Sequence, residues 1–154
     1  MTNIYPGQYR ISRIQLINWG TFHGYFSIPV ARKGFLITGG SGSGKSTLLD
    51  AMSAVLVPQK DLKFNAASQQ DLGRHDGRNL VSYVRGAWRQ QENTQTGEIA
   101  PEYLRTGATN SIVALTYDNG AGKQHTLIAI FRLNGGENSV SQVKKLYGLS
   151  LIHI

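Results

Sequence analysis

A glycine-rich segment that ends in a lysine and two hydroxyl residues is the part of this chain best suited to chemistry. It runs Gly39-Gly40-Ser41-Gly42-Ser43-Gly44-Lys45-Ser46-Thr47 and completes the pattern G-x-x-x-x-G-K-[ST]. Glycines let the backbone fold around a polyphosphate so that several N–H groups point inward. The ammonium of Lys45 would reach the β- and γ-phosphates, and the hydroxyl of Ser46 would coordinate Mg²⁺. The segment therefore predicts a binding site for ATP and Mg²⁺ made of residues 39–47.

The flanking residues predict the elements that this loop needs on either side. Gly34-Phe35-Leu36-Ile37-Thr38 is a short apolar, β-branched run, which indicates a buried parallel strand. Leu48 to Leu56 follows a helical apolar pattern that Pro58 would end. A helix beginning at the loop would add the positive end of its dipole to the phosphate site. The order strand, loop, helix is the context in which the motif binds nucleotides.

Composition and charge limit the class of protein. The chain has 154 residues, of which 40% are hydrophobic and 16% charged, as in a globular domain. It contains no cysteine, which excludes disulfides and thiolate metal sites. It has neither an apolar run long enough to span a membrane nor the pattern of a signal peptide, so we expect a cytoplasmic protein with no membrane partner. The net charge of +7 is spread along the chain and leaves binding to DNA open.

Elsewhere the pattern predicts strands, hairpins and short helices. Pro29 favours the edge of a sheet for the segment that contains it. The segment Asn79–Trp88 suits a short helix, Gln90–Gly97 a loop, and Val140–Tyr147 the start of a helix. Four segments alternate apolar and polar residues and are expected to form two antiparallel hairpins, the first leading into the predicted strand at residues 34–38: 9–18, 22–30, 111–117 and 125–133.

Several residues imitate catalytic or binding motifs. Asp118 ends a run similar to a Walker B strand, but Asp118-Asn119-Gly120 favours a tight turn. Leu133–Glu137 imitates an ABC signature with Asn134 in place of its serine, and we interpret it as a loop. Trp19 and Trp88 are expected in the core rather than as stacking platforms. None of the histidines has the spacing of metal ligands.

Two stretches together resemble a known family. Leu16-Ile17-Asn18-Trp19-Gly20-Thr21-Phe22, followed by Phe35 to Ala51 with its phosphate-binding loop, is similar to the N-terminal lobe of SMC-like ATPase heads. The closest resemblance is to the MukB/MksB/JetC branch of condensin-like and Wadjet-type ATPases. It implies an α/β P-loop NTPase of ABC/SMC type, with a β-meander leading into the Walker A strand and an antiparallel hairpin after it. Residues 1–154 would then be the N-terminal part of a head, ending before the coiled coil and the C-terminal lobe.

The resemblance also implies a function and partners. Such a lobe binds Mg-ATP, and hydrolysis needs the Walker B and signature motifs of the C-terminal lobe, so the chain alone is expected to be inactive. The implied partners are a second head (in a homodimer, or as the C-terminal lobe of the same protein), kleisin-type subunits and DNA. By spacing, Arg74 and Arg78 would contact DNA, although solvated arginines beside Asp71 and Asp76 fit the sequence equally well. Gly20 stands where many relatives place a phosphate-contacting arginine.

Two other functions fit the same residues. A stand-alone small P-loop kinase or nucleotidase would use Asp118 as its Walker B carboxylate. A basic module without enzymatic activity would grip the DNA backbone with the phosphate-binding loop. A heptad-rich coiled coil encoded after residue 154 would favour the head lobe, and a stop codon there would favour the kinase. Gln142 is the nearest candidate for the family's Mg²⁺-sensing glutamine, which we expect beyond Ile154.

Overall fold

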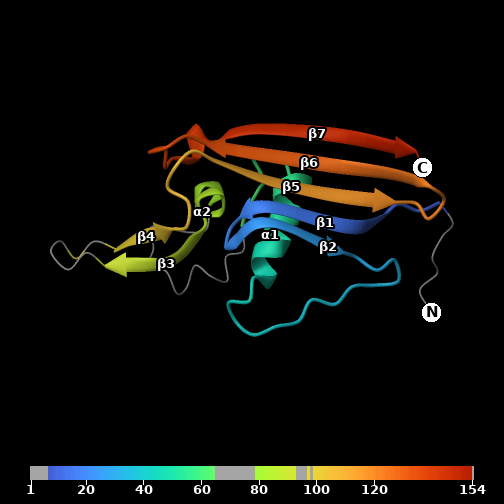
Figure 1. Ribbon diagram of the computed structural model, residues 1–154, viewed down its shortest axis with the longest axis horizontal. Coiled ribbons are helices and arrows are strands. Elements are labelled where there is room, and N and C mark those ends of the chain that lie inside the picture. The colour runs from blue at the N-terminus through green and yellow to red at the C-terminus, as the bar shows by residue number, and fades with distance from the viewer. Residues whose placement is uncertain (1–6, 65–78, 93–96, 98, 154) are drawn as a thin grey trace.

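A five-stranded antiparallel sheet of order β2-β1-β5-β6-β7 forms the body of the molecule (Figure 1). The computed structural model describes residues 7–64, 79–92, 97 and 99–153. Strands β1 and β2 form a hairpin, β5, β6 and β7 form a meander, and β1 joins the two by pairing with β5. The bounds of these strands are β1 Arg10–Trp19, β2 Phe22–Pro29, β5 Thr109–Asp118, β6 Lys123–Leu133 and β7 Lys144–His153.

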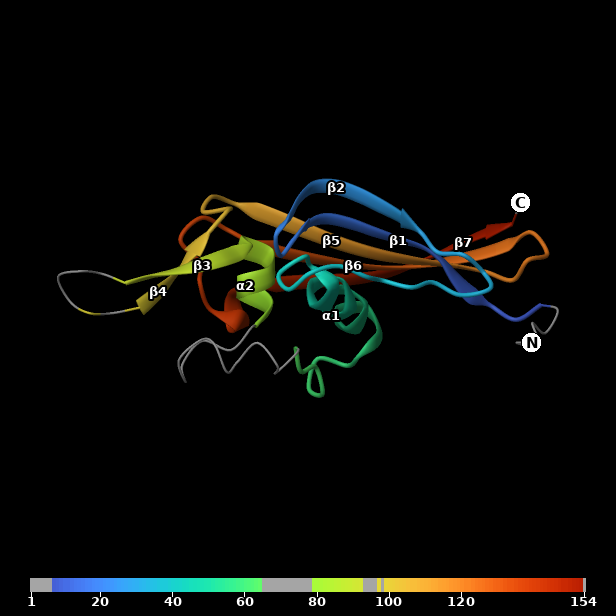
Figure 2. The ribbon, with the colours of Figure 1, turned by 90° about the horizontal axis from the view of Figure 1, so that it is seen from below.

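Both α-helices among the described residues lie on the same face of this sheet (Figure 2). Helix α1 spans Lys45–Leu56 and helix α2 spans Leu80–Arg85. After α2, strands β3 (Ala87–Glu92) and β4 (Ile99–Tyr103) form a separate hairpin that projects beyond the end of the sheet (Figure 1). A short 3₁₀ turn, Val140–Gln142, precedes β7.

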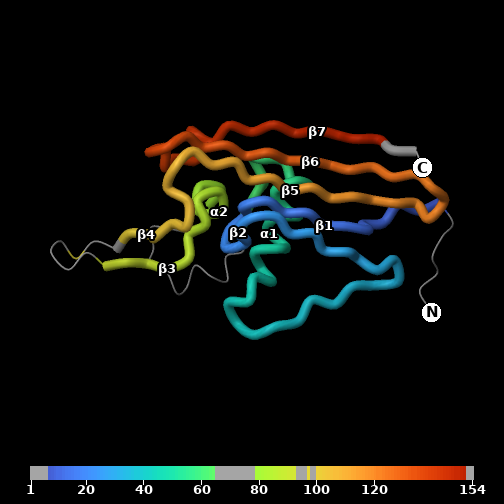
Figure 3. Tube along the Cα trace, viewed as in Figure 1, coloured from blue at the N-terminus to red at the C-terminus, as the bar shows by residue number. Residues whose placement is uncertain are grey.

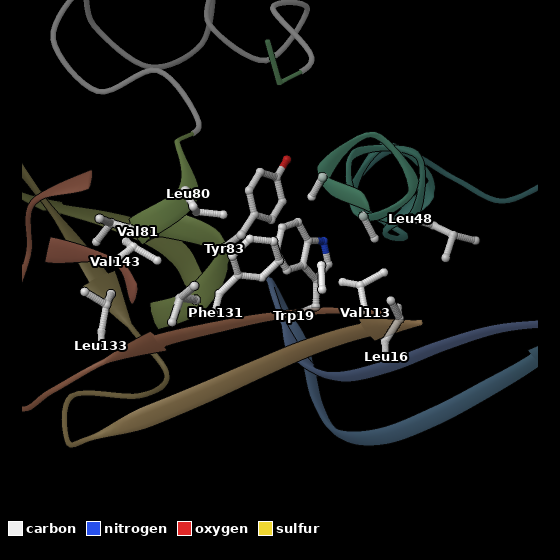
Figure 4. Close-up of a cluster of buried hydrophobic side chains, with 14 of the residues drawn as sticks. Leu16, Trp19, Leu48, Leu80, Val81, Tyr83, Val113, Phe131, Leu133 and Val143 are labelled. Carbon is white, nitrogen blue, oxygen red and sulfur yellow. The ribbon is translucent and has the colours of Figure 1, made fainter. Parts of the chain in front are cut away.

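The hydrophobic core lies between the sheet and the two helices (Figure 4). Alternate residues of β1, β5 and β6 point toward the helices, because successive side chains of a strand point to opposite faces. Trp19 is fully buried at the centre and its ring stacks on that of Tyr83 at a centroid distance of 4.8 Å. The sheet contributes Ile14, Leu16, Val113, Leu115, Ala129, Phe131 and Leu133, and the helices contribute Leu48, Ala51, Ala54, Leu80, Val81, Tyr83 and Val84.

Local sequence accounts for the bounds of α2. The side chain of Asn79 accepts a hydrogen bond from the backbone N–H of Ser82, and the Ser82 hydroxyl accepts one from the N–H of Asn79. This reciprocal capping satisfies donors that a helix start otherwise leaves free. Gly86 ends the helix with a φ of 69°, a left-handed conformation that glycine adopts without strain.

Two buried arginines join the end of α2 to the loops around it. Arg85 is 1% exposed and donates to the carbonyl oxygens of Asn134 and Glu137 at 2.5 and 2.8 Å. Arg105 is 8% exposed and donates to the carbonyl oxygens of Val84 and Gly20 at 2.9 and 2.8 Å. Burial lowers the pKa of Arg105 to about 10, which leaves it charged at neutral pH. The positive charge therefore sits against the carbonyl end of α2, where the helix dipole favours it.

Most of the predicted strands are confirmed. The segments 9–18 and 22–30 correspond to β1 and β2, and 111–117 and 125–133 to β5 and β6. The two hairpins pair as expected, and the strand with Pro29 lies at an edge of the sheet. The helix predicted from residue 79 is present as α2, although it ends at Arg85 rather than Trp88.

The predicted parallel strand at residues 34–38 is wrong. The trace from β2 to α1 runs outside the sheet as irregular chain (Figure 3), and Phe35 and Leu36 are 45% and 83% exposed. A strand needs a neighbour to satisfy its backbone hydrogen bonds, and no described strand runs beside this segment. All pairings among the described strands are antiparallel.

Three smaller predictions are also wrong. The segment from Val140 forms one 3₁₀ turn and then β7, because it pairs along the whole of β6. Residues 90–92, predicted as loop, belong to β3 and pair with β4. Trp88 is 47% exposed instead of buried, since its strand lies in the projecting hairpin, and its ring carries the guanidinium of Arg89 at 4.8 Å.

Candidate nucleotide-binding site

The glycine-rich segment leads directly into the start of α1. Its last glycine, Gly44, is the N-cap residue with a φ of 88°, and no side chain caps the helix there. No acidic residue lies in the first turn. Gly39 and Gly42 also have positive φ, at 155° and 78°, and a Cβ at Gly40 or Gly42 would meet no other atom within 4 Å. The loop is therefore open around Gly40 and Gly42, and the helix start carries neither a side-chain cap nor a negative charge, which favours binding of an anion.

The lysine of the motif lies over this loop. Lys45 Nζ donates hydrogen bonds to the carbonyl oxygens of Gly39 and Gly40 at 2.7 and 2.6 Å and to the hydroxyl of Ser43 at 3.3 Å. The ammonium is thus held against the loop. Ser46 follows in the first turn of α1, half-buried. Residues 39–47 thus form one continuous loop and helix start, and they carry the residue types with which this motif binds a polyphosphate and Mg²⁺.

The turn between β1 and β2 packs against the same helix start. Trp19 Nε1 donates to the carbonyl oxygen of Thr47 at 3.0 Å. A Cβ on Gly20 would lie 2.6 Å from Thr47 Cγ2, and one on Gly44 would lie 3.2 Å from Cζ of Phe22. A side chain at position 20 would collide with α1, so an arginine at this position would have no room in this fold. Glycine at this position allows the close approach of turn and helix.

Asn18 gives the turn its shape. It has a φ of 51°, in the left-handed region, which asparagine tolerates better than most residues. Its side-chain oxygen accepts a hydrogen bond from the N–H of Gly24 at 2.9 Å, and Ser111 donates through its hydroxyl to the carbonyl of Asn18. Asn18 and Trp19 thus have different structural roles: Asn18 bends the chain, and Trp19 fixes the turn to α1.

Sequence reasoning missed a second connection, between α1 and α2. Tyr83 donates a hydrogen bond through its hydroxyl to Asp50, and both side chains are buried. The backbone N–H of Gly20 donates to the carbonyl of Tyr83 at 2.8 Å, and Arg105 Nη2 donates to the carbonyl of Gly20. The turn, α1 and α2 therefore form one connected unit. The signal available in the sequence was the unusual carboxylate on the apolar face of the predicted helix.

The other candidates lie apart from this unit or serve the backbone. Asp118 is at the end of β5, where its carboxylate accepts from Arg32 at 3.1 Å and from the N–H of Gly120 at 2.9 Å. It belongs to the turn that joins β5 to β6, as predicted, and that turn lies at the end of the sheet away from the start of α1 (Figure 1). A Walker B role for Asp118 has no geometric support.

The signature-like segment and the candidate glutamine are structural. The backbone and side-chain amides of Asn134 donate hydrogen bonds to the Glu137 carboxylate, and these bonds close the turn after β6. They also hold the pKa of the Glu137 carboxyl below its usual range. Gln142 accepts from the N–H groups of Asn138 and Ser139 and caps the 3₁₀ turn. Arg74 and Arg78 lie outside the described residues.

Neither a metal site nor a membrane-spanning helix is found in the part of the chain that the structure describes. No group of histidine and acidic side chains there is arranged to hold a metal ion. His125 instead contacts Tyr9, with its Nε2 2.8 Å from the tyrosine hydroxyl. None of the helices described has both the length and the apolar character needed to cross a bilayer.

Comparison with known proteins agrees with the site. Residues 11–71 match the family model described as the P-loop containing region of AAA domain. The matched stretch starts in β1 and includes the β1–β2 turn, the glycine-rich loop and α1. Together with the loop geometry, this match supports a P-loop NTPase and indicates nucleotide binding. No curated protein matches the chain.

Proposed function

We propose that this chain is the ATP-binding N-terminal lobe of an SMC-like ATPase head of the MukB/MksB/JetC type, which serves DNA organisation or plasmid defence. Residues 39–47 bind Mg-ATP, with Lys45 on the β- and γ-phosphates and Ser46 on Mg²⁺. The observation that carries nucleotide binding is the uncapped start of α1 beneath a loop of positive-φ glycines, with the Lys45 ammonium held beside it.

The SMC-like part of the proposal rests on the contact between the two stretches that carry the resemblance, residues 16–22 and 35–51. The turn Asn18–Phe22 and the phosphate-binding loop are separated in sequence but meet at α1. Trp19 bonds to Thr47, and Phe22 lies against Gly44. This contact gives a physical reason for the two stretches to occur together, because the turn of the first positions helix α1, which begins in the second.

The need for a second lobe is supported by exposed apolar residues along α1 and just before the loop. Leu49 and Leu56 are 54% and 48% exposed, and they lie seven positions apart, on the same side of α1. Phe35 and Leu36 are exposed just before the loop. A C-terminal lobe that packs against α1 and the chain just before the loop would bury all four. We infer that this lobe carries the Walker B and signature motifs and that hydrolysis requires it.

The wider partners are proposals from the family resemblance. They are a second head, kleisin-type subunits and DNA. The excess of basic over acidic residues, +7 in total, is compatible with a polyanion. Arg74 and Arg78 remain predicted phosphate contacts, which filter binding of the Arg74→Glu, Arg78→Glu double variant over a range of salt concentrations would test.

Titration calorimetry with ATP and Mg²⁺ tests the nucleotide site. Lys45→Ala should weaken ATP binding by about 10- to 100-fold, because charge-assisted hydrogen bonds to phosphate contribute about 1.5–3 kcal/mol. Lys33→Ala is the matched control, since Lys33 is an exposed lysine just before the loop, and it should bind like the parent. Ser46→Ala should weaken binding mainly when Mg²⁺ is present. Equal ATP affinity for Lys45→Ala and the parent would overturn the assignment of the loop.

A further inference from the structure

The sheet has a second face, opposite the helices, and no described helix lies on it (Figure 2). We call it the open face. The strand register places one residue of each strand in a single row across it. From edge to edge, the directly paired residues of this row are Tyr25, Ile17, Ile112, Ile130 and Leu146.

This row is apolar although it faces away from the core. Tyr25 and Leu146 at its ends are 61% and 64% exposed, and the three isoleucines between them are only partly buried. The next row continues the apolar surface on β5 and β6 with Ala114 and Ile128, which pair directly, and carries the polar residues Gln15 and Ser27 on β1 and β2. An antiparallel sheet with one solvated face normally carries polar residues on that face. An apolar band across all five strands is instead typical of a surface that another molecule covers.

The charges beside the band are positive. Arg132 and Lys144 pair with each other in the row on one side of Ile130 and Leu146. Arg13 lies on the same face at the other side of the band, in the row beyond Gln15 and Ala114. Within the described residues, no ion pair joins these three side chains to a carboxylate. The one acidic residue that the described strands place on this face is Asp118, and it is bonded to Arg32. Lys144 is near enough to the Glu137 carboxylate to interact with it electrostatically, whereas Arg132 and Arg13 have no such partner among the ion pairs of the described residues. The open face therefore has an apolar centre and a border with an excess of basic side chains.

The charges on the open face distinguish between the kinds of molecule that could bind there. A second copy of the chain would place the same basic border against itself and has no free carboxylate on this face to offer. Nucleic acid would satisfy the cations but would leave the isoleucines against phosphates and sugars. A protein segment with an apolar stripe and acidic flanks satisfies both features at once.

The length of the band indicates the size of that segment. Five strands are separated by four steps of about 4.8 Å, which makes a row of about 19 Å. An α-helix rises about 1.5 Å per residue, so about 13 residues span the row. We propose that the open face binds an amphipathic helix of a partner protein, with its apolar stripe along the row from Tyr25 to Leu146 and its acidic residues facing Arg132, Lys144 and Arg13. This binding is independent of the proposed nucleotide site.

Two synthetic helices test the proposal by fluorescence anisotropy with the purified chain. Both carry leucines at helical spacing over about 13 residues, as the row requires; the flanks of one are glutamates and those of the other are lysines. The glutamate peptide should bind, and the lysine peptide should bind at least about tenfold more weakly because its charge is repelled. Equal binding of the two peptides, or no binding of either, would overturn the proposal.

Matched variants locate the binding surface. Leu146 and Leu149 lie on the same strand with similar exposure, 64% and 59%, but on opposite faces of the sheet. Leu146→Ser should weaken binding of the glutamate peptide by about tenfold, and Leu149→Ser should leave it unchanged. Arg132→Glu should also weaken it, whereas Lys123→Glu, at the far end of β6, should not. A Leu149→Ser effect as large as that of Leu146→Ser would contradict the assignment, as would unchanged binding by Leu146→Ser.

Three further measurements separate other occupants. Sedimentation equilibrium of the parent, binding to duplex DNA and binding to phosphatidylserine vesicles are each repeated with Leu146→Ser. The proposal expects no change in any of them. Loss of self-association, DNA binding or vesicle binding in this variant would overturn the proposal in favour of that occupant. Lys45→Ala should bind the glutamate peptide like the parent, so failure of the nucleotide site leaves this test intact.

Discussion

The two sides of helix α1 differ in how completely the chain supports them. On the inner side, Leu48, Ala51 and Ala54 are buried against the sheet, and Trp19 and Tyr83 bond to the helix. On the outer side, Leu49 and Leu56 are about half exposed, although they are as apolar as the inner residues. The position of the helix on the sheet is thus fixed by this chain itself, whereas apolar side chains on its outer surface are left uncovered, which is where the proposed second lobe would pack.

The largest effect should come from the tryptophan that fixes the inner side. Trp19→Ala should lower the free energy of unfolding by about 3–5 kcal/mol, because it leaves a cavity in the core and removes the hydrogen bond to Thr47. Trp88→Ala is the control, since Trp88 is 47% exposed, and it should change stability by about 1 kcal/mol or less. Urea unfolding followed by circular dichroism measures both. Similar losses for the two variants would contradict the central place of Trp19.

A smaller effect should follow from the link between α1 and α2. Tyr83→Phe keeps the ring stacked on Trp19 but removes the hydrogen bond that the buried carboxylate of Asp50 accepts. We expect a loss of about 1–3 kcal/mol, the range for a buried polar group that loses a partner. Tyr147→Phe, which removes the bond from Gln59 to an exposed hydroxyl, should cost about 0.5 kcal/mol or less. Denaturant midpoints at equal slope give the comparison, and equal costs would show that the Asp50 link adds no stability.

The smallest effect should come from the outer side of α1. Leu49→Ala should change the free energy of unfolding of the chain by about 0.5 kcal/mol or less, because the side chain is 54% exposed. Its neighbour Leu48 is 5% exposed, and Leu48→Ala should cost about 2–5 kcal/mol. The same thermal or urea unfolding series measures the pair. A large loss for Leu49→Ala would show that this chain already covers the outer side, which would weaken the proposal of a second lobe.

The sequence predicts those parts of the fold that depend on local pattern. Alternation identifies β1, β2, β5 and β6, and the Asp118-Asn119-Gly120 turn is predicted from its residue types. Residues 34–38 carry a similar apolar, β-branched signal, yet they form no strand because pairing depends on a neighbour that composition does not reveal. In β7 the opposite occurs: the local pattern weakly favours a helix, but pairing with the neighbouring strand β6 makes the segment a strand.

The candidate site is predicted less evenly. The loop residues 39–47 follow from one motif, because each residue type has a role in holding phosphate. The residues that support the loop do not. Tyr83 lies 33 positions from Asp50, and Arg105 lies 85 positions from Gly20, so only the fold brings each pair together. Arginines at such positions are normally expected in solvent, and their burial against backbone carbonyls has no sequence signal.

The pairing of β1 with β5 has a consequence for the order of folding. The contact between Ser12 and Thr116 spans 104 positions, and both helices lie within the chain that it encloses. Hairpins form within microseconds, whereas contacts of this range close slowly because the intervening chain must lose its freedom. The β1–β2 hairpin and the β5–β6–β7 meander should therefore form first. The phosphate-binding loop gains its support only when they join, so nucleotide binding during refolding should follow closure of the sheet rather than formation of helix α1.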